Sequence, residues 1–346
     1  MNAMIKTKPL RLLQIGMGGW GRSWAESVVP KLKTVKALAW VDANPAALET
    51  AQKALKLPKK SCFDSLKNAL EFSEVDAVLI TASAVVHAPI AIEALKAGLH
   101  VLVEKPFALT LEDAQKVIDV ARVQKRTVMV SQNYRYQPAP QLVAQLVRDQ
   151  TLGQVGAVQV DFRRDNMYPA ADMAHLQWTQ PLLLDMAIHH FDLMRFILQQ
   201  DALELYAQAW NPVWSLYRDP ASATVNFGFE NNTVVNYRGS WVSPSPVTPW
   251  AGEWKLECEH GEISFTSRDN NAPDMVKLKK LGKRERKLEL PDLEFIGRLG
   301  SLNAFVESIR TETEPATSGR DNIKSLQLSL EAIRSAQEKR LIRLDR

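Results

Sequence analysis

The sequence predicts an α/β protein of two domains: an N-terminal doubly wound parallel sheet, and a C-terminal α+β domain with a large open, mainly antiparallel sheet. Three observations predict it. The chain has 346 residues and 46% hydrophobic composition, which is more than one ordinary core needs. Strand-like and helix-like segments alternate up to about residue 131. From about residue 150, strand-like runs follow one another between turn signals. We place the domains at residues 1–131 and 132–346.

In the first domain, short apolar segments alternate with amphipathic ones. Strands are expected at residues 10–15, 35–41, 75–80, 100–103 and 127–130. Helices are expected at residues 20–29, 45–57, 64–72 and 88–97, and in a segment that Thr110 opens. Gly98 is a C-terminal stop, and Thr110 with Asp113 three residues later is a variant of the capping box.

In the second domain, the strand-like runs alternate apolar and polar residues. Strands are expected at residues 154–164, 204–210, 224–229, 233–241, 254–259, 262–267 and 276–290, with hairpin turns at Asn231-Asn232 and His260-Gly261. Helices are expected at residues 181–198, near 293–310 and near 321–338. Helices should cover one face of the sheet, and runs such as 233–241 indicate that the other face is buried in a homodimer or homotetramer. The proline-rich segment 243–250 is expected to be a rigid loop, either a lid or an oligomer contact.

Composition excludes several classes of protein. The net charge of +4 is small for a chain of this length. In the basic run at residues 277–287, the charged residues alternate with leucines around Gly282, as in a hairpin with one solvated face, so we do not expect the protein to bind nucleic acid. Two cysteines, Cys62 and Cys258, fall in different predicted domains, which excludes a disulfide framework and favours a reducing compartment. Apolar runs of signal-peptide or membrane-spanning length are missing, so we expect a cytoplasmic protein without membrane contact.

A glycine-rich loop joins the first predicted strand to the first predicted helix. Gly16, Gly18 and Gly21 have the spacing of the dinucleotide-binding fingerprint. Gly16 permits a tight turn, Gly18 lets the backbone approach a pyrophosphate, and Gly21 lets helix and strand pack closely, with the anion at the helix N-terminus. We therefore expect this loop to bind a dinucleotide.

The acidic residue that completes this fingerprint is Asp42, at the end of the second predicted strand. Its carboxylate could accept hydrogen bonds from both ribose hydroxyls and would repel a 2′-phosphate. No cation follows in residues 43–45, and only Arg22, just past the glycines, could offset the negative charge. NAD is therefore the expected cofactor, and NADP is less favoured.

Further candidates follow other strands of the predicted parallel sheet. Glu104-Lys105-Pro106 comes directly after the strand at 100–103, so its side chains emerge at the carboxyl edge of the sheet, where ligands of doubly wound folds lie. The peptide bond before Pro106 is unusually able to be cis. The predicted cofactor-binding residues are Gly16, Gly18, Gly19, Trp20, Gly21, Asp42, Thr81, Ser83, His87, Glu104 and Lys105.

The helix at 181–198 carries the second group of polar candidates. Asp185, His189 and Asp192 fall at i, i+4 and i+7, hence on one face, while His190 points elsewhere. That face meets either water or a site. We favour a catalytic pair over a solvated face, and over a metal site that would have to recruit His175 or His190.

Taken in order, these segments and Gln132-Asn133-Tyr134-Arg135-Tyr136 resemble the glucose-fructose oxidoreductase, inositol dehydrogenase and rhizopine catabolism family, written Gfo/Idh/MocA. The resemblance covers essentially the whole chain. It implies a Rossmann domain, and a second domain whose open sheet commonly mediates dimers or tetramers. It also implies that Lys105, Asp185 and His189 are catalytic and that Tyr134 and Arg135 bind substrate together with Asp185 and His189.

This sequence departs from the family pattern in two places. Ala187 stands where glycine is usual, and Thr179-Gln180-Pro181 replaces a glycine-rich entry to the helix. Both changes bear on the identity of the substrate more than on the type of reaction.

The resemblance implies oxidation of a secondary alcohol of a sugar, polyol or related compound to a ketone, or the reverse. His189 would take the hydroxyl proton, Lys105 would hydrogen-bond the same oxygen, and Asp185 would bind substrate or orient His189. Whether Lys105 or His189 is the base stays open. One alternative is an NAD-dependent glycosidase. The other is a non-catalytic NAD-binding sensor, but a sensor should have lost Lys105, Asp185 and His189. No metal is expected.

Overall fold

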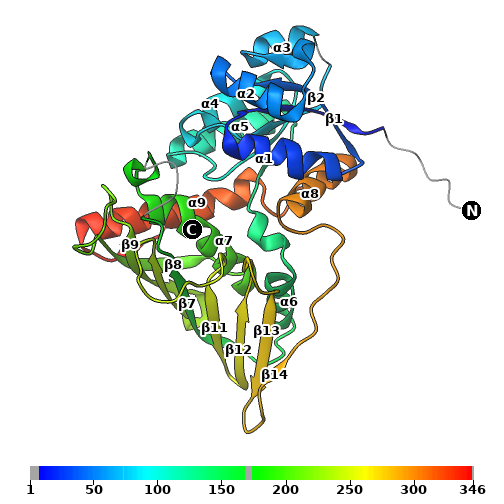
Figure 1. The fold of residues 1–346 in the computed structure, drawn as a ribbon. Coiled ribbons are helices and arrows are strands. Elements are labelled where there is room, and N and C mark those ends of the chain that lie inside the picture. The colour runs from blue at the N-terminus through cyan, green and yellow to red at the C-terminus, as the bar shows by residue number, and fades with distance from the viewer. Residues whose placement is uncertain (1–7, 73, 168–173, 345–346) are drawn as a thin grey trace, which may run out of the picture. The chain divides into compact units, whose positions relative to one another are not determined.

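The structure is a computed structural model that describes residues 8–72, 74–167 and 174–344 (Figure 1). The chain divides into two compact units. The first runs to Asn133 and also includes Gly297–Ile323, and the second consists of Tyr134–Ile296 and Lys324–Arg346. The predicted boundary after residue 131 is thus displaced by two residues, and the predicted second domain, 132–346, is interrupted by a segment that belongs to the first unit.

The first unit contains a six-stranded parallel sheet in the order β3-β2-β1-β4-β5-β6, the order of a dinucleotide-binding fold. Its strands are β1 (Leu10–Ile15), β2 (Val35–Val41), β3 (Cys62–Phe63), β4 (Ala77–Ile80), β5 (His100–Val103) and β6 (Val128–Val130). The helices are α1 (Gly19–Ser27), α2 (Pro45–Leu55), α3 (Leu66–Phe72), α4 (His87–Lys96), α5 (Leu111–Gln124) and α8 (Gly297–Thr311). The predicted parallel sheet is confirmed.

Capping residues set the limits of several of these helices. Asn44 Oδ1 accepts a hydrogen bond from Ala46 N at 3.0 Å and so caps α2. Thr110 Oγ1 accepts from Asp113 N at 3.1 Å and caps α5, as predicted. Gly98 follows α4 with a φ of +81°, which is the left-handed conformation that ends a helix.

The returning segment, Gly297–Ile323, covers the open edge of β6. Val130 N donates to Thr317 O at 2.9 Å, and Thr317 Oγ1 donates to Val130 O at 2.7 Å. An uncovered edge strand would leave these backbone groups without partners inside the protein. The contact explains why residues so late in the sequence belong to the first unit.

The second unit is built on a nine-stranded sheet in the order β14-β13-β12-β11-β7-β10-β9-β8-β15 (Figure 1). Only β7 and β10 pair in parallel, so the predicted mainly antiparallel sheet is confirmed. The strands are β7 (Val155–Arg163), β8 (Ala202–Trp210), β9 (Ser222–Phe229), β10 (Val234–Ser240), β11 (Glu253–Cys258), β12 (Gly261–Thr266), β13 (Met275–Lys280), β14 (Arg286–Lys287) and β15 (Ile342–Arg343).

Helices of the second unit are α6 (Pro138–Arg148), the π-helix η6 (Pro181–Met186) and α7 (Ala187–Leu198). The long helix α9 (Gly319–Glu338) begins in the first unit and continues into the second. Short 3-10 segments are η1 (Val29–Lys31), η2 (Lys59–Ser61), η3 (Ala84–Val86), η4 (Asn133–Tyr136), η5 (Ala174–Gln177) and η7 (Glu230–Asn232). No helix in the described part of the chain has the length and apolar character needed to cross a membrane.

The two faces of the nine-stranded sheet differ in polarity. Val235 and Tyr237 of β10 are at most 2% exposed, and Phe191 of α7 packs on Tyr237 with ring centroids 5.1 Å apart. The opposite face carries polar pairs, such as Arg238 Nε with Asp161 Oδ1 at 2.9 Å. The apolar alternation of residues 233–241 therefore faces the helices. It does not supply the apolar oligomer surface that the sequence suggested.

Candidate functional site

The glycine loop has the geometry that the sequence predicts. Gly16 has a φ of +93°, and a Cβ there would lie 2.3 Å from Ala82 N. A Cβ on Gly21 would lie 1.8 Å from Gly16 O, so only glycine allows α1 to pack this closely on β1. At Gly18 and Gly19, by contrast, a Cβ would meet no heavy atom of the described residues within 4 Å, apart from the adjoining backbone.

This open space lies at the N-terminus of α1. Gly18, the N-cap residue, provides no side chain to accept from the first N–H groups of the helix. Such N–H groups and the positive end of the helix dipole favour an anion. The loop therefore fits the pyrophosphate of a dinucleotide.

Asp42 lies directly after β2 and is already tied to the loop. Its Oδ2 accepts from Met17 N at 2.6 Å and its Oδ1 accepts from Asn44 N at 2.8 Å. These bonds hold the carboxylate beside the glycines, and each oxygen has a further lone pair for a ribose hydroxyl. The geometry fits the role predicted for Asp42.

Thr81 and His87 are buried and hold backbone around the loop. Thr81 Oγ1 donates to Gly16 O at 2.7 Å and accepts from Gln14 Nε2 at 3.1 Å. The two ring nitrogens of His87 lie 2.7 Å from Pro106 O and 3.0 Å from Ala82 O, and burial lowers the pKa of the ring. These contacts are with other atoms of the first unit, so the two side chains hold the loop in position. Ser83, between them in sequence, is exposed.

Glu104 is also engaged inside the first unit. It is 3% exposed, and its Oε1 accepts from Trp24 Nε1 of α1 at 2.7 Å. Its Oε2 accepts from Lys105 N at 3.2 Å. The Lys105–Pro106 peptide bond is cis, as the sequence allows. Glu104 thus links α1 to the backbone of Lys105, whose side chain is half-buried.

Sequence reasoning missed Arg298 of α8. Its guanidinium lies 4.4 Å from the ring centroid of Trp20 and 5.4 Å from that of Trp24, and its Nη2 donates to Ser23 Oγ at 3.0 Å. Trp20 itself is 48% exposed beside the open loop. No local pattern in the sequence indicates this contact, since it joins residues more than 270 positions apart.

In the second unit, the structure brings His189 and Tyr134 together. Their rings are stacked, with centroids 4.2 Å apart and planes 4° apart. The guanidinium of Arg268 lies 4.1 Å from the centroid of the Tyr134 ring. His189, 6% exposed, therefore has a fixed ring orientation.

Arg135, predicted to bind substrate, forms a buried ion pair with Asp192. Its Nε and Nη2 donate to the two carboxylate oxygens of Asp192, each at 2.6 Å. Asp192 Oδ1 also accepts from Ser325 Oγ at 2.8 Å, and that hydroxyl accepts from Arg195 Nη1 at 2.8 Å. Arg135 and Asp192 are 5% and 1% exposed. The ion pair of Arg135 with Asp192 therefore lies in the interior of the second unit.

Helix α7, which carries His189 and Asp192, is buried on almost all sides. Every residue of α7 except Phe196 is buried. Asp185 lies before α7 in the π-helical turn η6, so the α-helical i, i+4 spacing does not place it on one face with His189. Asp185 remains half-buried.

Two other histidines of this unit, His175 and His190, have partners in its interior. His190 contacts Tyr237 Oη at 3.2 Å and Trp250 O at 3.1 Å, and burial lowers its pKa to about 4. His175 Nε2 lies 2.8 Å from Asn166 O. Among the residues that the structure describes, no group of three or more His, Cys, Asp or Glu side chains could hold a metal ion.

The two parts of the chain match two parts of one protein family. Residues 10–132 match the oxidoreductase family with an NAD-binding Rossmann fold, and residues 141–264 match the GFO/IDH/MocA C-terminal domain. The chain belongs to the Gfo/Idh/MocA oxidoreductase family. The family resemblance inferred from the motifs is confirmed, as is the NAD-binding Rossmann domain.

Several Gfo/Idh/MocA relatives are similar over nearly their whole length. Inositol 2-dehydrogenase of Rhizobium meliloti is 26% identical over 337 residues, which cover 95% of this chain and 97% of the relative. Myo-inositol 2-dehydrogenase of Thermotoga maritima is 23% identical, with 97% and 99% covered. An oxidoreductase from Agrobacterium radiobacter, solved with NAD+, L-tartaric acid and magnesium, shares the fold with a TM-score of 0.85 at 18% identity, covering 97% of this chain and 98% of its own.

The two positions that depart from the Gfo/Idh/MocA pattern differ in backbone conformation. Gln180 has a φ of +49°, a left-handed conformation that glycine adopts more easily, and its N donates to Asp219 Oδ2 at 3.0 Å. Ala187 has a φ of −64° in ordinary right-handed helix, so a side chain is unstrained there.

Lys105 belongs to the first unit, and Asp185 and His189 belong to the second.

Proposed function

We propose that this family member interconverts a secondary alcohol and a ketone on a sugar, a polyol such as an inositol, or a related compound. Support comes from two relatives named as inositol dehydrogenases, which are similar over at least 95% of this chain. The observation that carries the proposal is the buried, oriented His189 ring, stacked on Tyr134. A general base needs a fixed position, because proton transfer depends on distance and direction.

In the proposed mechanism, bound NAD supplies the hydride chemistry and the chain binds substrate and moves protons. His189 accepts the hydroxyl proton during oxidation and returns it during reduction. The ammonium group of Lys105 donates a hydrogen bond to the same oxygen and stabilises its developing negative charge. Asp185 binds another substrate hydroxyl or orients His189. The alternative, with Lys105 as the base, uses the same two residues with exchanged roles.

Single substitutions test these roles. Lys105→Ala and His189→Ala should each lower turnover by about 10²- to 10⁴-fold and leave NAD affinity nearly unchanged, because each removes a group that acts on the reacting oxygen. Lys96→Ala and His260→Ala, at exposed positions of the first and second unit, are the matched controls. Substrates would first be found by screening sugars, inositols and sugar acids for a change in nicotinamide absorbance.

The outcomes separate the alternatives. Near-normal turnover in either variant would remove that residue from the mechanism. Release of sugar from a glycoside without net nicotinamide reduction would favour the glycosidase. Activity abolished by a chelator and restored by a metal ion would replace the metal-free mechanism.

We also propose that the chain prefers NAD to NADP. Support comes from the Asp42 carboxylate, which Met17 N and Asn44 N hold beside the glycine loop. In calorimetry, NAD should bind more tightly, and Asp42→Asn should narrow the difference because it removes the negative charge but keeps an oxygen acceptor. A second variant, Arg22→Gln, removes the one cation near the glycine loop in sequence that could offset the negative charge of Asp42. Tighter binding of NADP by the native chain would reject the preference.

A further inference from the structure

A separate cavity lies within the first unit, at the edge of the sheet opposite the glycine loop. His100 at the start of β5 and Val128 at the start of β6 line it. The glycine loop instead follows the carboxyl end of β1, and all strands of this sheet run parallel. The cavity has a volume of about 560 Å³, within the range of small-molecule sites.

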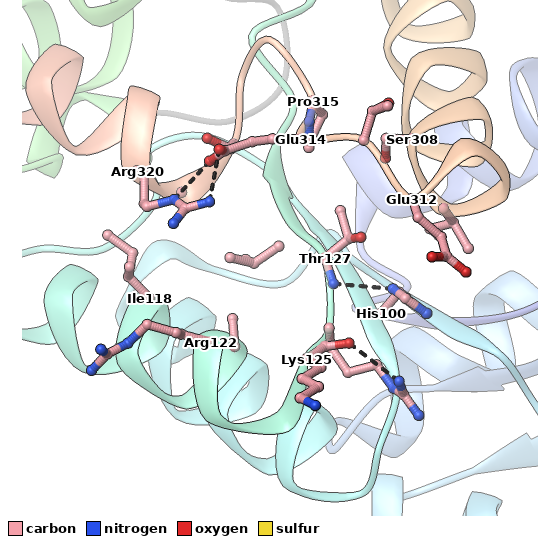
Figure 2. Close-up of a pocket in the computed structure, with 17 residues that line it drawn as sticks. His100, Ile118, Arg122, Lys125, Thr127, Ser308, Glu312, Glu314, Pro315 and Arg320 are labelled. Carbon is pink, nitrogen blue, oxygen red and sulfur yellow. Dashed lines mark hydrogen bonds and ion pairs between the residues drawn. The ribbon is translucent and has the colours of Figure 1, made fainter.

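The wall of the cavity combines three parts of the first unit, and Figure 2 shows side chains from all of them around the central hollow. One part is the second half of α5 with the turn that follows it, the second is the start of β5 and β6, and the third runs from the end of α8 to the start of α9. The apolar side chains of the lining are those of Ile118, Ala121, Val128, Ile309 and Pro315.

Positive charge exceeds negative charge in this lining. Arg122, Lys125, Arg126 and Arg320 stand against the carboxylates of Glu312 and Glu314. Glu314 is already neutralised, because Arg320 donates to its two oxygens at 2.8 and 2.7 Å and lowers the pKa of its carboxyl group (Figure 2). Arg122 is paired with Asp119 Oδ1 at 3.3 Å, at an exposed position, so the remaining excess is that of Lys125 and Arg126 over Glu312. This excess of positive charge favours an anionic ligand.

Arg126 is oriented by the backbone beside it. Its Nε donates to Gly98 O, and its Nη1 donates to Lys125 O at 3.2 Å. A guanidinium group has five N–H donors, so these two bonds fix its direction and leave others for a ligand. Planar guanidinium groups suit phosphate and carboxylate oxygens.

His100 adds a neutral donor to the same wall. Its Nδ1 accepts a hydrogen bond from Thr127 N at 3.1 Å, and burial lowers its pKa to about 4. At neutral pH the ring is therefore uncharged and carries its proton on Nε2. The lining also includes the hydroxyl groups of Thr127, Ser308, Thr313 and Ser318.

We propose that this cavity is a second ligand site, which binds a small organic anion with a phosphate or carboxylate head and an apolar body. The head group pairs with Arg126 and with Arg122 or Lys125. The apolar body packs against Ile118 and Val128.

Calorimetry on the full chain saturated with NAD tests the proposal, because NAD occupies the glycine loop, which could itself bind phosphate. The probes are phenyl phosphate and benzoate, with benzamide as the uncharged control. At least one anion should bind ten times more tightly than benzamide, and the tighter of the two identifies the head group. Equal affinity for benzamide and both anions would overturn the proposal.

Charge-removing variants localise the site. Arg126→Gln should weaken binding of the preferred anion by about tenfold or more, since it removes charge-assisted hydrogen bonds. Arg126 also holds Gly98, so the double variant R122Q/K125Q, at two exposed positions, gives an independent measurement and should weaken binding similarly. Lys33→Gln, an exposed lysine of the same unit outside the cavity, should bind as the native chain does. Unchanged affinity in R122Q/K125Q would overturn the assignment to this cavity.

Discussion

Replacing Asp192 with alanine should strongly destabilise the second unit. Asp192 is 1% exposed, and its carboxylate accepts two hydrogen bonds from Arg135 and one from Ser325. The variant leaves the Arg135 guanidinium, itself 5% exposed, inside the protein without its counter-ion. The substitution therefore separates an internal role of Arg135 from the predicted role in substrate binding.

The expected loss can be estimated from the burial of the pair. Removing one partner of a buried ion pair costs about 3–5 kcal/mol, chiefly because the other charge is left uncompensated. Domains are stable by about 5–15 kcal/mol, so a large part of the stability would be lost. The Ser325→Ala variant removes one hydrogen bond of the same carboxylate and should cost less, about 1.5–3 kcal/mol.

Urea unfolding of the full chain, followed by circular dichroism, measures these differences. The double variant R135M/D192L should recover most of the loss, because apolar side chains of similar volume often replace a buried pair at little cost. Surface substitutions usually change the unfolding free energy by no more than about 0.5 kcal/mol. If Asp192→Ala also stays within about 0.5 kcal/mol of the native value, the reasoning is refuted. A raised KM with unchanged stability in Arg135→Lys would support the predicted role of Arg135 in substrate binding.

Two further predictions concern α1 and the open sheet face. Trp24→Phe removes the donor to the buried Glu104 Oε1 and should cost about 1.5–3 kcal/mol of unfolding free energy, measured by urea unfolding, whereas Trp20→Phe, at a half-exposed position, should cost less. If both variants unfold alike, the Trp24 bond contributes nothing measurable. Light scattering should give a dimer or tetramer at micromolar concentration. Because the open sheet face carries charged side chains such as Arg238 and Asp161, contacts between subunits across that face would be ionic, and 1 M salt should weaken the association. A mass of 38.9 kDa at every concentration would contradict the oligomer.

Strands with a clear apolar pattern were predictable from the sequence, and very short ones were not. β1, β2 and β5 have the predicted bounds. β3 and β15 contain two residues each, too few to show any alternation, and they form only because a neighbouring strand supplies hydrogen-bond partners. Helix α6 was missed although it begins with Pro138, a residue common in the first turn of a helix.

For the candidate site, the sequence predicted where polar residues stand but not what they contact. Thr81 and Glu104 do follow buried strands, as expected for residues at a ligand-binding edge. Their partners, Gly16 and Trp24, lie 65 and 80 positions away in the sequence. A position after a strand is a local property, whereas a hydrogen-bond partner is set by tertiary packing, so a residue that contacts the cofactor and one that holds the loop look the same in the sequence.

Helix α7 shows why spacing alone could not settle the role of its polar residues. A carboxylate and a histidine at helical spacing can meet water, a substrate or another buried charge, and each outcome satisfies the same pattern. Arg135 and Ser325 decide the case for Asp192, and they stand 57 and 133 positions away from it in the sequence. His189 on the same helix stacks on Tyr134, the residue directly before Arg135. The ion pair of Arg135 thus fixes the same segment of backbone that holds the His189 ring, so an internal contact of α7 contributes to the orientation that catalysis by His189 would require.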